Sequence, residues 1–292
     1  MRRADAPTRP SLTDYDACVR RSYRPGKTHL TNRRADVETG YGTYAAGRGR
    51  PHLVARTKDW GDPDVGFQQG LYEHTWEGGW LEDVRSDVLA AARGICLLCN
   101  AAQPRTIDHL LPQSDYPALS IYAPNLIGAC ADCNRIKSNK CHDDPARQFV
   151  HPYFEPIPTD LPFLRAEVIA DGVLSPQFEI VDHDGIDGEL TARLRWQFAE
   201  LQVNSFYRNE AVLFFQKRQY AWEEAAEAGW VGLATSLRGD LRSTVRAFGV
   251  NYWESAFIQG LLDSAEFRAD PMKFLTANVA TLFAARQPEP AE

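Results

Sequence analysis

Residues 96–140 read CLLCNAAQPRTIDHLLPQSDYPALSIYAPNLIGACADCNRIKSNK, and this stretch decides what the chain folds around. It contains two pairs of cysteines with CxxC spacing, Cys96/Cys99 and Cys130/Cys133. Each pair forms a tight knuckle that offers two thiolates, and two pairs complete the tetrahedral coordination that zinc prefers. Because four cysteines leave no open position for water, we expect a structural zinc ion rather than a catalytic one.

The polar residues enclosed by the cysteines are harder to assign to structure alone. Asp108 and His109 are adjacent, Asn125 precedes an apolar run, and Asn134 directly follows the last cysteine. Each is ordinary in isolation, since such residues cap helices, form turns or fill polar core positions. The cysteines alone would favour a zinc ribbon with no enzymatic role. The four polar residues in this order, between two knuckles, instead indicate a reaction site.

The stretch from Cys96 to Lys140 resembles the HNH (ββα-metal) nuclease family. Zinc-containing members of that family carry CxxC, Asp-His-x-x-Pro, Asn, and a second CxxC followed by His or Asn. The third position here is Asn134 rather than His, a variant that the family accepts. The resemblance implies an α+β chain in which a small zinc-stabilised ββα-metal core is embedded in mainly helical sequence.

The resemblance also implies a role for each site residue. His109 would act as general base on a water molecule, and Asn125 would orient its imidazole. Asp108 and Asn134 would present oxygen atoms to one catalytic cation, and such ligands select Mg²⁺ or Mn²⁺. Since neighbouring residues of a regular strand point to opposite faces, we expect a local distortion at Asp108 and His109.

Other residues near the site are candidates for nucleic-acid contact. Arg135 and Lys137 follow Asn134 and would meet the phosphate backbone, with solvated charge as the alternative. His151, in Phe149-Val-His-Pro-Tyr-Phe154, resembles an extension of bacterial HNH proteins. It would support the site residues or bind phosphate, or would be a packed histidine.

Charge along the chain is uneven, although the formal net charge is −7. The segment before Asp59 is basic, whereas the sequence after Cys141 is acidic. The basic clusters Arg20-Arg21, Arg33-Arg34 and Arg48-Gly-Arg50 would neutralise phosphates or form a solvated face. Aromatic residues would stack on bases or lie in the core, namely Tyr41, Tyr44, Trp76 and Trp80.

Periodicity and turn residues divide the chain into five segments. They are a mainly helical, basic region (1–93), the HNH core (94–155), a short β-hairpin insertion (156–188), a helical region (189–286) and a disordered tail (287–292). A helix from Leu81 should end at Gly94 in a left-handed cap, and the hairpin should turn at Asp171-Gly172. Apolar stripes predict core helices from Leu190 to Leu201 and around Trp253 to Leu261.

The leading hypothesis is a metal-dependent HNH endonuclease acting on DNA, with RNA left open. The alternative is a zinc-stabilised nucleic-acid-binding or interaction module that has lost cleavage. A zinc deaminase is excluded because it needs an open zinc position and a His-x-Glu motif, and a thiol-redox enzyme lacks the required βαβ setting. No apolar run suits a membrane span or signal peptide, and the cysteine pattern favours the cytoplasm. Similarity to Septu-type HNH proteins suggests antiphage defence with an ATPase partner.

Overall fold

The computed structural model describes residues 2–170 and 174–277, which form an α+β protein with many helices and two small antiparallel hairpins. The α+β prediction is therefore confirmed. The chain divides into two compact units, Met1–Ile157 with Ala192–Leu201 and Pro158–Thr191 with Gln202–Glu292. This division differs from the five expected segments, because the hairpin groups with the C-terminal helices and part of helix α6 returns to the first unit.

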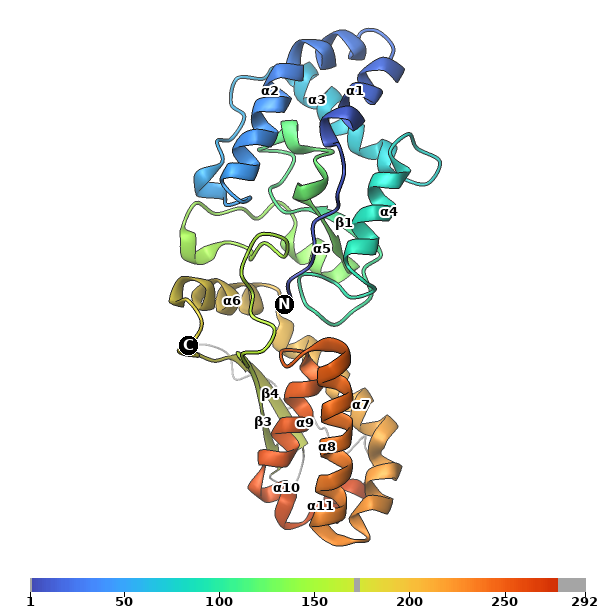
Figure 1. Cartoon of the computed structure of the whole chain (residues 1–292), viewed down its shortest axis with the longest axis vertical. Helices are drawn as coiled ribbons and strands as arrows, with labels where there is room; N and C mark the ends of the chain where they lie inside the picture. The colour runs from blue at the N-terminus through green and yellow to red at the C-terminus, as the bar shows by residue number, and fades with distance from the viewer. Residues whose placement is uncertain (1, 171–173, 278–292) are drawn as a thin grey trace. The chain divides into compact units, whose positions relative to one another are not determined.

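The first unit surrounds a two-stranded ladder with helices, as Figure 1 shows. Its helices are α1 (Ser11–Arg21), α2 (Gly26–Ala46), α3 (Asp62–Gly70), α4 (Glu82–Ala91), α5 (Ala131–Lys137) and most of α6 (Gly188–Glu200). Its single turns of 3-10 helix are η1 (Pro51–Leu53), η2 (Leu71–Thr75), η3 (Pro117–Leu119), η4 (Ala123–Asn125) and η5 (Pro145–Arg147). Strand β1 (Thr106–His109) pairs antiparallel with β2 (Leu126–Ala129), and His109 lies opposite Leu126.

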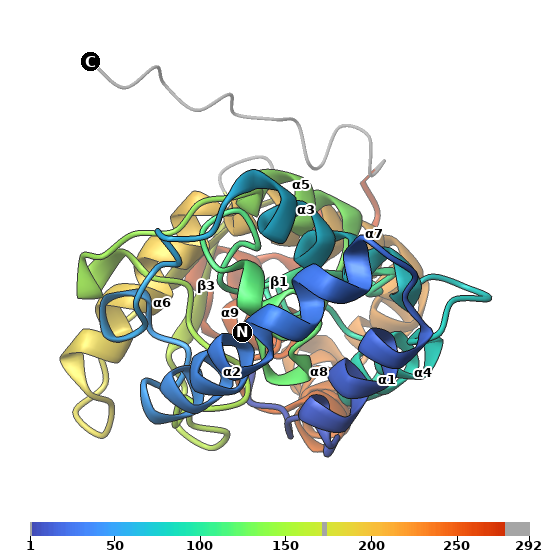
Figure 2. The ribbon, with the colours of Figure 1, turned by 90° about the horizontal axis from the view of Figure 1, so that it is seen from above.

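The core of this unit brings distant segments together. Helices α1, α2 and α4 contribute Tyr15, Leu30, Val84 and Val88, which pack with buried apolar residues from the ladder and the turns after it. Figure 2 shows these helices gathered over the ladder. The end of helix α4 comes close to β2. A Cβ atom at Gly128 would lie only 2.7 Å from that of Ala92, the residue after the helix. The helix ends at Ala91, earlier than the predicted end at Gly94, and the two residues after the cap, Arg93 and Gly94, have positive φ angles of +46° and +76°.

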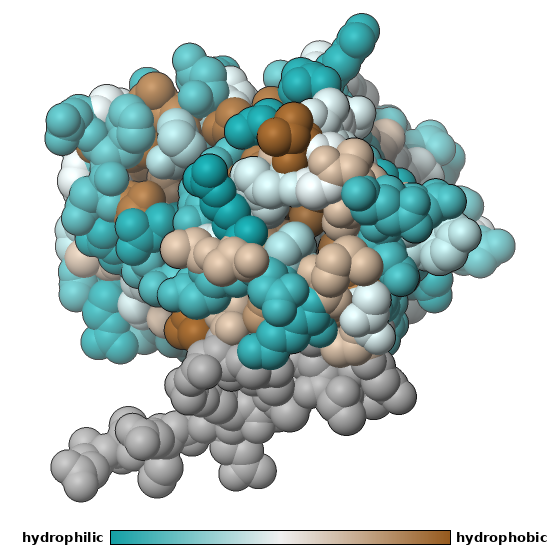
Figure 3. All heavy atoms as spheres, turned by 90° about the horizontal axis from the view of Figure 1, so that it is seen from below, coloured by the Kyte–Doolittle hydropathy of each residue, from teal (hydrophilic) through white to brown (hydrophobic). Residues whose placement is uncertain are grey.

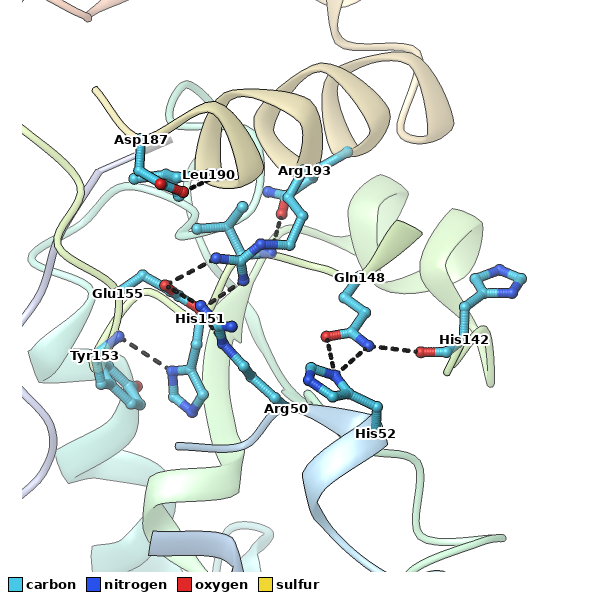
Figure 4. Close-up of polar contacts among 12 residues, drawn as sticks. Arg50, His52, His142, Gln148, His151, Tyr153, Glu155, Asp187, Leu190 and Arg193 are labelled. Atoms are coloured by element: carbon cyan, nitrogen blue, oxygen red, sulfur yellow. Dashed lines mark hydrogen bonds and ion pairs between the residues drawn. The ribbon is translucent and has the colours of Figure 1, made fainter. Parts of the chain in front are cut away.

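A buried group of charges fixes helix α6 in the first unit (Figure 4). The guanidinium of Arg193 donates to both carboxylate oxygens of Glu155, over 2.5 and 3.0 Å, and Arg50 pairs with the same carboxylate. Burial opposes ionisation of Glu155, but the two arginines outweigh it and lower the pKa of its carboxyl. The carboxylate therefore stays charged and holds two distant segments together.

The second unit combines a hairpin with a helical bundle. It contains β3 (Leu164–Ala170), β4 (Leu174–Ile180), α7 (Val203–Ala226), α8 (Gly229–Phe248), α9 (Trp253–Asp263), α10 (Ala265–Ala269) and α11 (Pro271–Leu275). Alternate residues of β3 are buried and the strand packs against α9, where a Cβ atom at Gly260 would lie 2.5 Å from the Ala166 carbonyl oxygen. The predicted hairpin and core stripes are confirmed, since the stripe residues are buried.

Two expectations fall partly or wholly on residues that the structure leaves undescribed, namely the turn at Asp171-Gly172 and the tail from 287. Among the described residues, no helix is both long and apolar enough to span a membrane. On the face shown in Figure 3, hydrophobic residues are scattered among hydrophilic ones. The part of that face formed by described residues therefore shows no large apolar patch of the kind that marks a docking surface.

Candidate metal centre and active site

The four predicted zinc cysteines meet at one point in the first unit. The sulfur atoms of Cys96, Cys99, Cys130 and Cys133 lie within 4.8 Å of one another, and all four residues are buried. Sulfur atoms around a tetrahedral zinc ion with ~2.3 Å bonds are about 3.8 Å apart, close to the 4.0 Å between Cys99 and Cys130. The cluster therefore suits a metal ion such as zinc.

The backbone explains how the two knuckles meet. The amide of Leu97 donates to the Gly128 carbonyl, so the first knuckle attaches to strand β2. Cys130 caps the N-terminus of α5, where its sulfur accepts a hydrogen bond from the Cys133 amide. The cluster thus ties together the end of β2, the start of α5 and the segment that follows α4.

Asp108 and His109 line one open pocket of about 520 Å³, together with Asn134 and Arg135. Both residues reach this pocket although they are neighbours in β1, because the strand ends at His109 and the pocket wraps its end. Asp108 is buried and its Oδ2 atom makes no hydrogen bond. Burial raises the pKa of this carboxyl, and the nearby Lys137 opposes that effect. Lys137 Nζ lies 3.4 Å from this Oδ2 atom, and a buried carboxylate that lines a pocket fits the expected cation ligand.

The imidazole of His109 has a defined tautomer. Its Nε2 atom lies 2.8 Å from the Ser120 carbonyl oxygen, which only accepts, so Nε2 carries the proton and Nδ1 keeps a lone pair. The ring of Tyr72 lies 4.6 Å away, and its hydroxyl donates to the Ile107 carbonyl. Burial lowers the pKa of His109 to about 4, so the ring is neutral at neutral pH and is a weaker base than a free imidazole.

Asn125 was expected to orient the His109 imidazole, but its side-chain hydrogen bonds go to the backbone of Leu111. Its carboxamide accepts from the Leu111 amide at 2.9 Å and donates to the Leu111 carbonyl at 3.0 Å. The side chain therefore clamps the backbone two residues after His109. The atom that orients the ring is the carbonyl of Ser120, which no side-chain pattern in the sequence reveals.

Asn134 is oriented by Thr106, a residue that the sequence analysis missed. The Thr106 hydroxyl donates to the Ala129 carbonyl, so it can only accept from the Asn134 amide nitrogen at 3.1 Å. This contact fixes the carboxamide and leaves its Oδ1 atom as the free acceptor. Two oxygen donors, one from Asp108 and one from Asn134, therefore line the same pocket.

The expectation that Lys137 meets the phosphate backbone is wrong. Its side chain is 0 % exposed, and its ammonium donates to the His109 carbonyl at 2.5 Å. The same nitrogen lies 3.4 Å from Asp108 Oδ2 and 5.6 Å from the centre of the Phe149 ring. Lysine three residues after Asn134 falls on the same helix face, so it turns inward with the site. Lys137 therefore stabilises the end of β1 through its hydrogen bond to the His109 carbonyl.

Substituting Lys137 by methionine should reduce the free energy of unfolding by about 3–5 kcal/mol, because it leaves the buried Asp108 carboxylate without its cation. Urea denaturation of both proteins measures this difference. The control is Arg135→Met, since Arg135 is 75 % exposed and its pair with Asp132 spans 3.8 Å. The control should change stability by less than about 0.5 kcal/mol. Equal, small effects at both positions would contradict the buried role.

The basic N-terminal clusters offer less free charge than expected. Arg33 pairs with Asp64 and Asp36, Arg34 with Asp16 and Glu38. Arg50 belongs to the buried group around Glu155. These arginines are therefore largely neutralised by carboxylates. Arg135 has the exposure and the position at the pocket that phosphate contact requires.

His151 is a packed histidine outside the pocket. Its Nδ1 atom accepts from the Tyr153 amide, and Nε2 lies 2.9 Å from the Tyr44 hydroxyl, which in turn reaches the Pro124 carbonyl (Figure 4 shows the Tyr153 bond). A Cβ atom at Gly49, where φ is +67°, would lie 2.5 Å from the His151 ring. His151 therefore steadies the turn before Asn125 rather than touching the pocket.

His151 gives a prediction about acid stability. Burial lowers its pKa from 6.5 to about 3, so between these values the unfolded chain binds more protons than the folded one. The free energy of unfolding should therefore decrease as the pH is lowered, by up to about 1.4 kcal/mol per pH unit below pH ~6. Urea titrations at several pH values should show a shallower fall for His151→Gln. The cysteine cluster is present in both proteins, so it does not cause a difference between them. Equal slopes of unfolding free energy against pH in the two proteins would contradict a neutral, buried His151 ring.

Comparison with known proteins gives one partial match. The chain is 34 % identical over 71 residues to Protein ea31 of Escherichia phage lambda, and the match covers 24 % of each protein. The matched segment is thus about a quarter of that relative's length. No protein-family model matches the chain, and no solved structure matches it.

Proposed function

We propose that the chain is a metal-dependent endonuclease of the HNH type that hydrolyses phosphodiester bonds, with DNA as the expected substrate and RNA left open. The observation that carries this proposal is the pocket at the end of β1. It is lined by a neutral imidazole, a buried carboxylate and a fixed carboxamide, from His109, Asp108 and Asn134. General base and oxygen ligands on one short ββα segment are what metal-assisted hydrolysis needs.

The pocket residues fit a hard divalent cation. The Asp108 carboxylate has the Lys137 ammonium as its ion-pair partner, 3.4 Å from Oδ2, and Asn134 is turned so that its oxygen accepts no hydrogen bond from Thr106. Oxygen donors of this kind suit Mg²⁺ or Mn²⁺, whereas the four cysteines suit zinc. A bound cation would supply Lewis-acid stabilisation of the charge that develops on the phosphate.

The chain's own residues would divide the remaining work. His109 would take a proton from the attacking water at Nδ1, while Ser120 holds the ring through Nε2. The clamp that Asn125 places on Leu111 fixes the backbone that leaves the strand. Lys137 opposes the rise that burial causes in the pKa of Asp108, and the exposed Arg135 would contact the phosphate backbone.

A zinc-stabilised nucleic-acid-binding module without cleavage is the second candidate. It is favoured by the ammonium of Lys137, which lies 3.4 Å from Asp108 Oδ2 and already provides a cation there. Plasmid nicking separates the two functions. Supercoiled DNA should be nicked only after Mg²⁺ or Mn²⁺ is added to the zinc-loaded chain, and binding without nicking under every metal condition would support the module.

The broader biological expectations rest on resemblance alone and stay predictions. They are an ATPase partner, a role in antiphage defence and a cytoplasmic location. Co-purification of the full chain with an ATPase encoded beside it would test the first of them.

A further inference from the structure

Trp76 is an exposed aromatic residue at the proposed active site. Its side chain is 57 % exposed and lines the same pocket as Asp108 and His109. The other aromatic candidates behave differently, since Tyr41 and Tyr44 are buried and Trp80 stacks on His74 at 4.1 Å. Tryptophan normally buries most of its large apolar surface, so an exposed indole beside a polar pocket indicates a surface that binds a ligand.

The indole is held in place on one face. The guanidinium of Arg85 lies over its ring at 5.3 Å and also donates to the Arg105 carbonyl at 2.9 Å, directly before β1. The ring is therefore tied to the strand that carries Asp108 and His109. Because Arg85 covers one face, the exposed surface of the ring lies mainly on its other face and its edges.

Trp76 and the Arg85 side chain behind it, called the platform below, are also close to His109, the proposed general base. Trp76 directly follows η2, and Tyr72 of that turn packs against the His109 ring and donates to the Ile107 carbonyl. The segment around the indole carries Glu73, Glu77 and Glu82, whereas Arg85 and Arg135 line the pocket beside it. The feature of this segment that suits a base is the aromatic face of Trp76.

We propose that Trp76, backed by Arg85, stacks on an unpaired base next to the phosphate that the site would cleave, so that the preferred substrate is single-stranded or locally unpaired DNA. The inference rests on the proposed nuclease function. In a regular duplex both faces of each base are covered by its neighbours, so an aromatic face meets a base only where the strand is unstacked.

Binding tests the platform independently of cleavage. We would use full-length His109→Ala protein, which should not cut the probe, with a short DNA strand and the same sequence as a duplex. The single strand should bind more tightly and quench tryptophan fluorescence. Adding Trp76→Ala should weaken single-strand binding about tenfold, and Trp76→Phe should retain most binding but lose the quenching. Trp80→Ala, outside the pocket, should change neither.

Each outcome separates this inference from the proposed function. If the duplex binds as well as the single strand, or if Trp76→Ala weakens both equally, the platform is wrong even where wild type cleaves DNA. If Trp76 governs single-strand binding while wild type never cleaves with Mg²⁺ or Mn²⁺, the platform stands and the nuclease proposal fails. If neither probe binds, the platform is overturned, and plasmid nicking by the wild type decides the nuclease proposal.

Discussion

On the proposed nuclease function, replacing His109 by alanine should lower the rate of phosphodiester cleavage by about 100-fold or more, which is the usual contribution of a positioned general base. The reason is the tautomer imposed by Ser120, which leaves Nδ1 as a proton acceptor in the pocket. Plasmid nicking with Mg²⁺ or Mn²⁺, followed over time, measures the effect. DNA binding should change much less, because Arg135 and Trp76 remain.

The control for this experiment is His142→Ala, because His142 lies outside the pocket and packs edge-on against Trp196. It should cut DNA at the wild-type rate. Since His109 is buried, metal content and circular dichroism must show that its variant is folded. A folded His109→Ala protein that nicks DNA as fast as wild type would remove the general-base assignment.

Replacing Cys130 by serine should prevent the first unit from folding. Structural zinc contributes about 10–16 kcal/mol in small zinc-binding peptides, which is comparable to the whole stability of a typical domain. Cys130 both belongs to the cluster and caps α5. We expect bound zinc to fall from about one equivalent to near zero, together with loss of the cooperative thermal transition of this unit.

Cys141→Ser is the matched control, since Cys141 is a half-buried free thiol outside the cluster. It should keep one equivalent of zinc through mild chelation and melt close to wild type. Zinc retained by Cys130→Ser at the wild-type level would contradict a four-cysteine site.

The cysteine cluster and the ββα order could be predicted because both depend on local sequence. CxxC spacing brings two thiols together within one turn, and the distance between the pairs leaves room for one short hairpin. The stripes from Leu190 and Trp253 likewise follow from helical periodicity. These features need no knowledge of distant contacts.

The contacts that orient the site could not be predicted in the same way. His109 is held by the backbone carbonyl of Ser120, and Asn125 binds the backbone of Leu111. Any residue type supplies such backbone atoms, so the sequence carries no signal for them. Lys137 did carry a signal, since it comes three positions after Asn134 on one helix, but its charge alone predicted exposure.

The grouping of the hairpin with the C-terminal helices also depends on distant packing. β3 lies against α9, which comes more than eighty residues later in the chain, and Gly260 allows their close approach. A glycine inside an apolar helix was the one visible sign. It indicates a close neighbour without saying which segment that is.

The pairing of Glu155 with Arg193 has a consequence for the order in which the protein is made. The first unit is interrupted in sequence, because Arg193 lies beyond the hairpin of the second unit. A ribosome therefore has to synthesise residues 158–191 before the nascent first unit receives its last helix. Until then Glu155 has Arg50 as its cationic partner, and a fragment that stops at Ile157 would lack the two hydrogen bonds that Arg193 donates to this carboxylate.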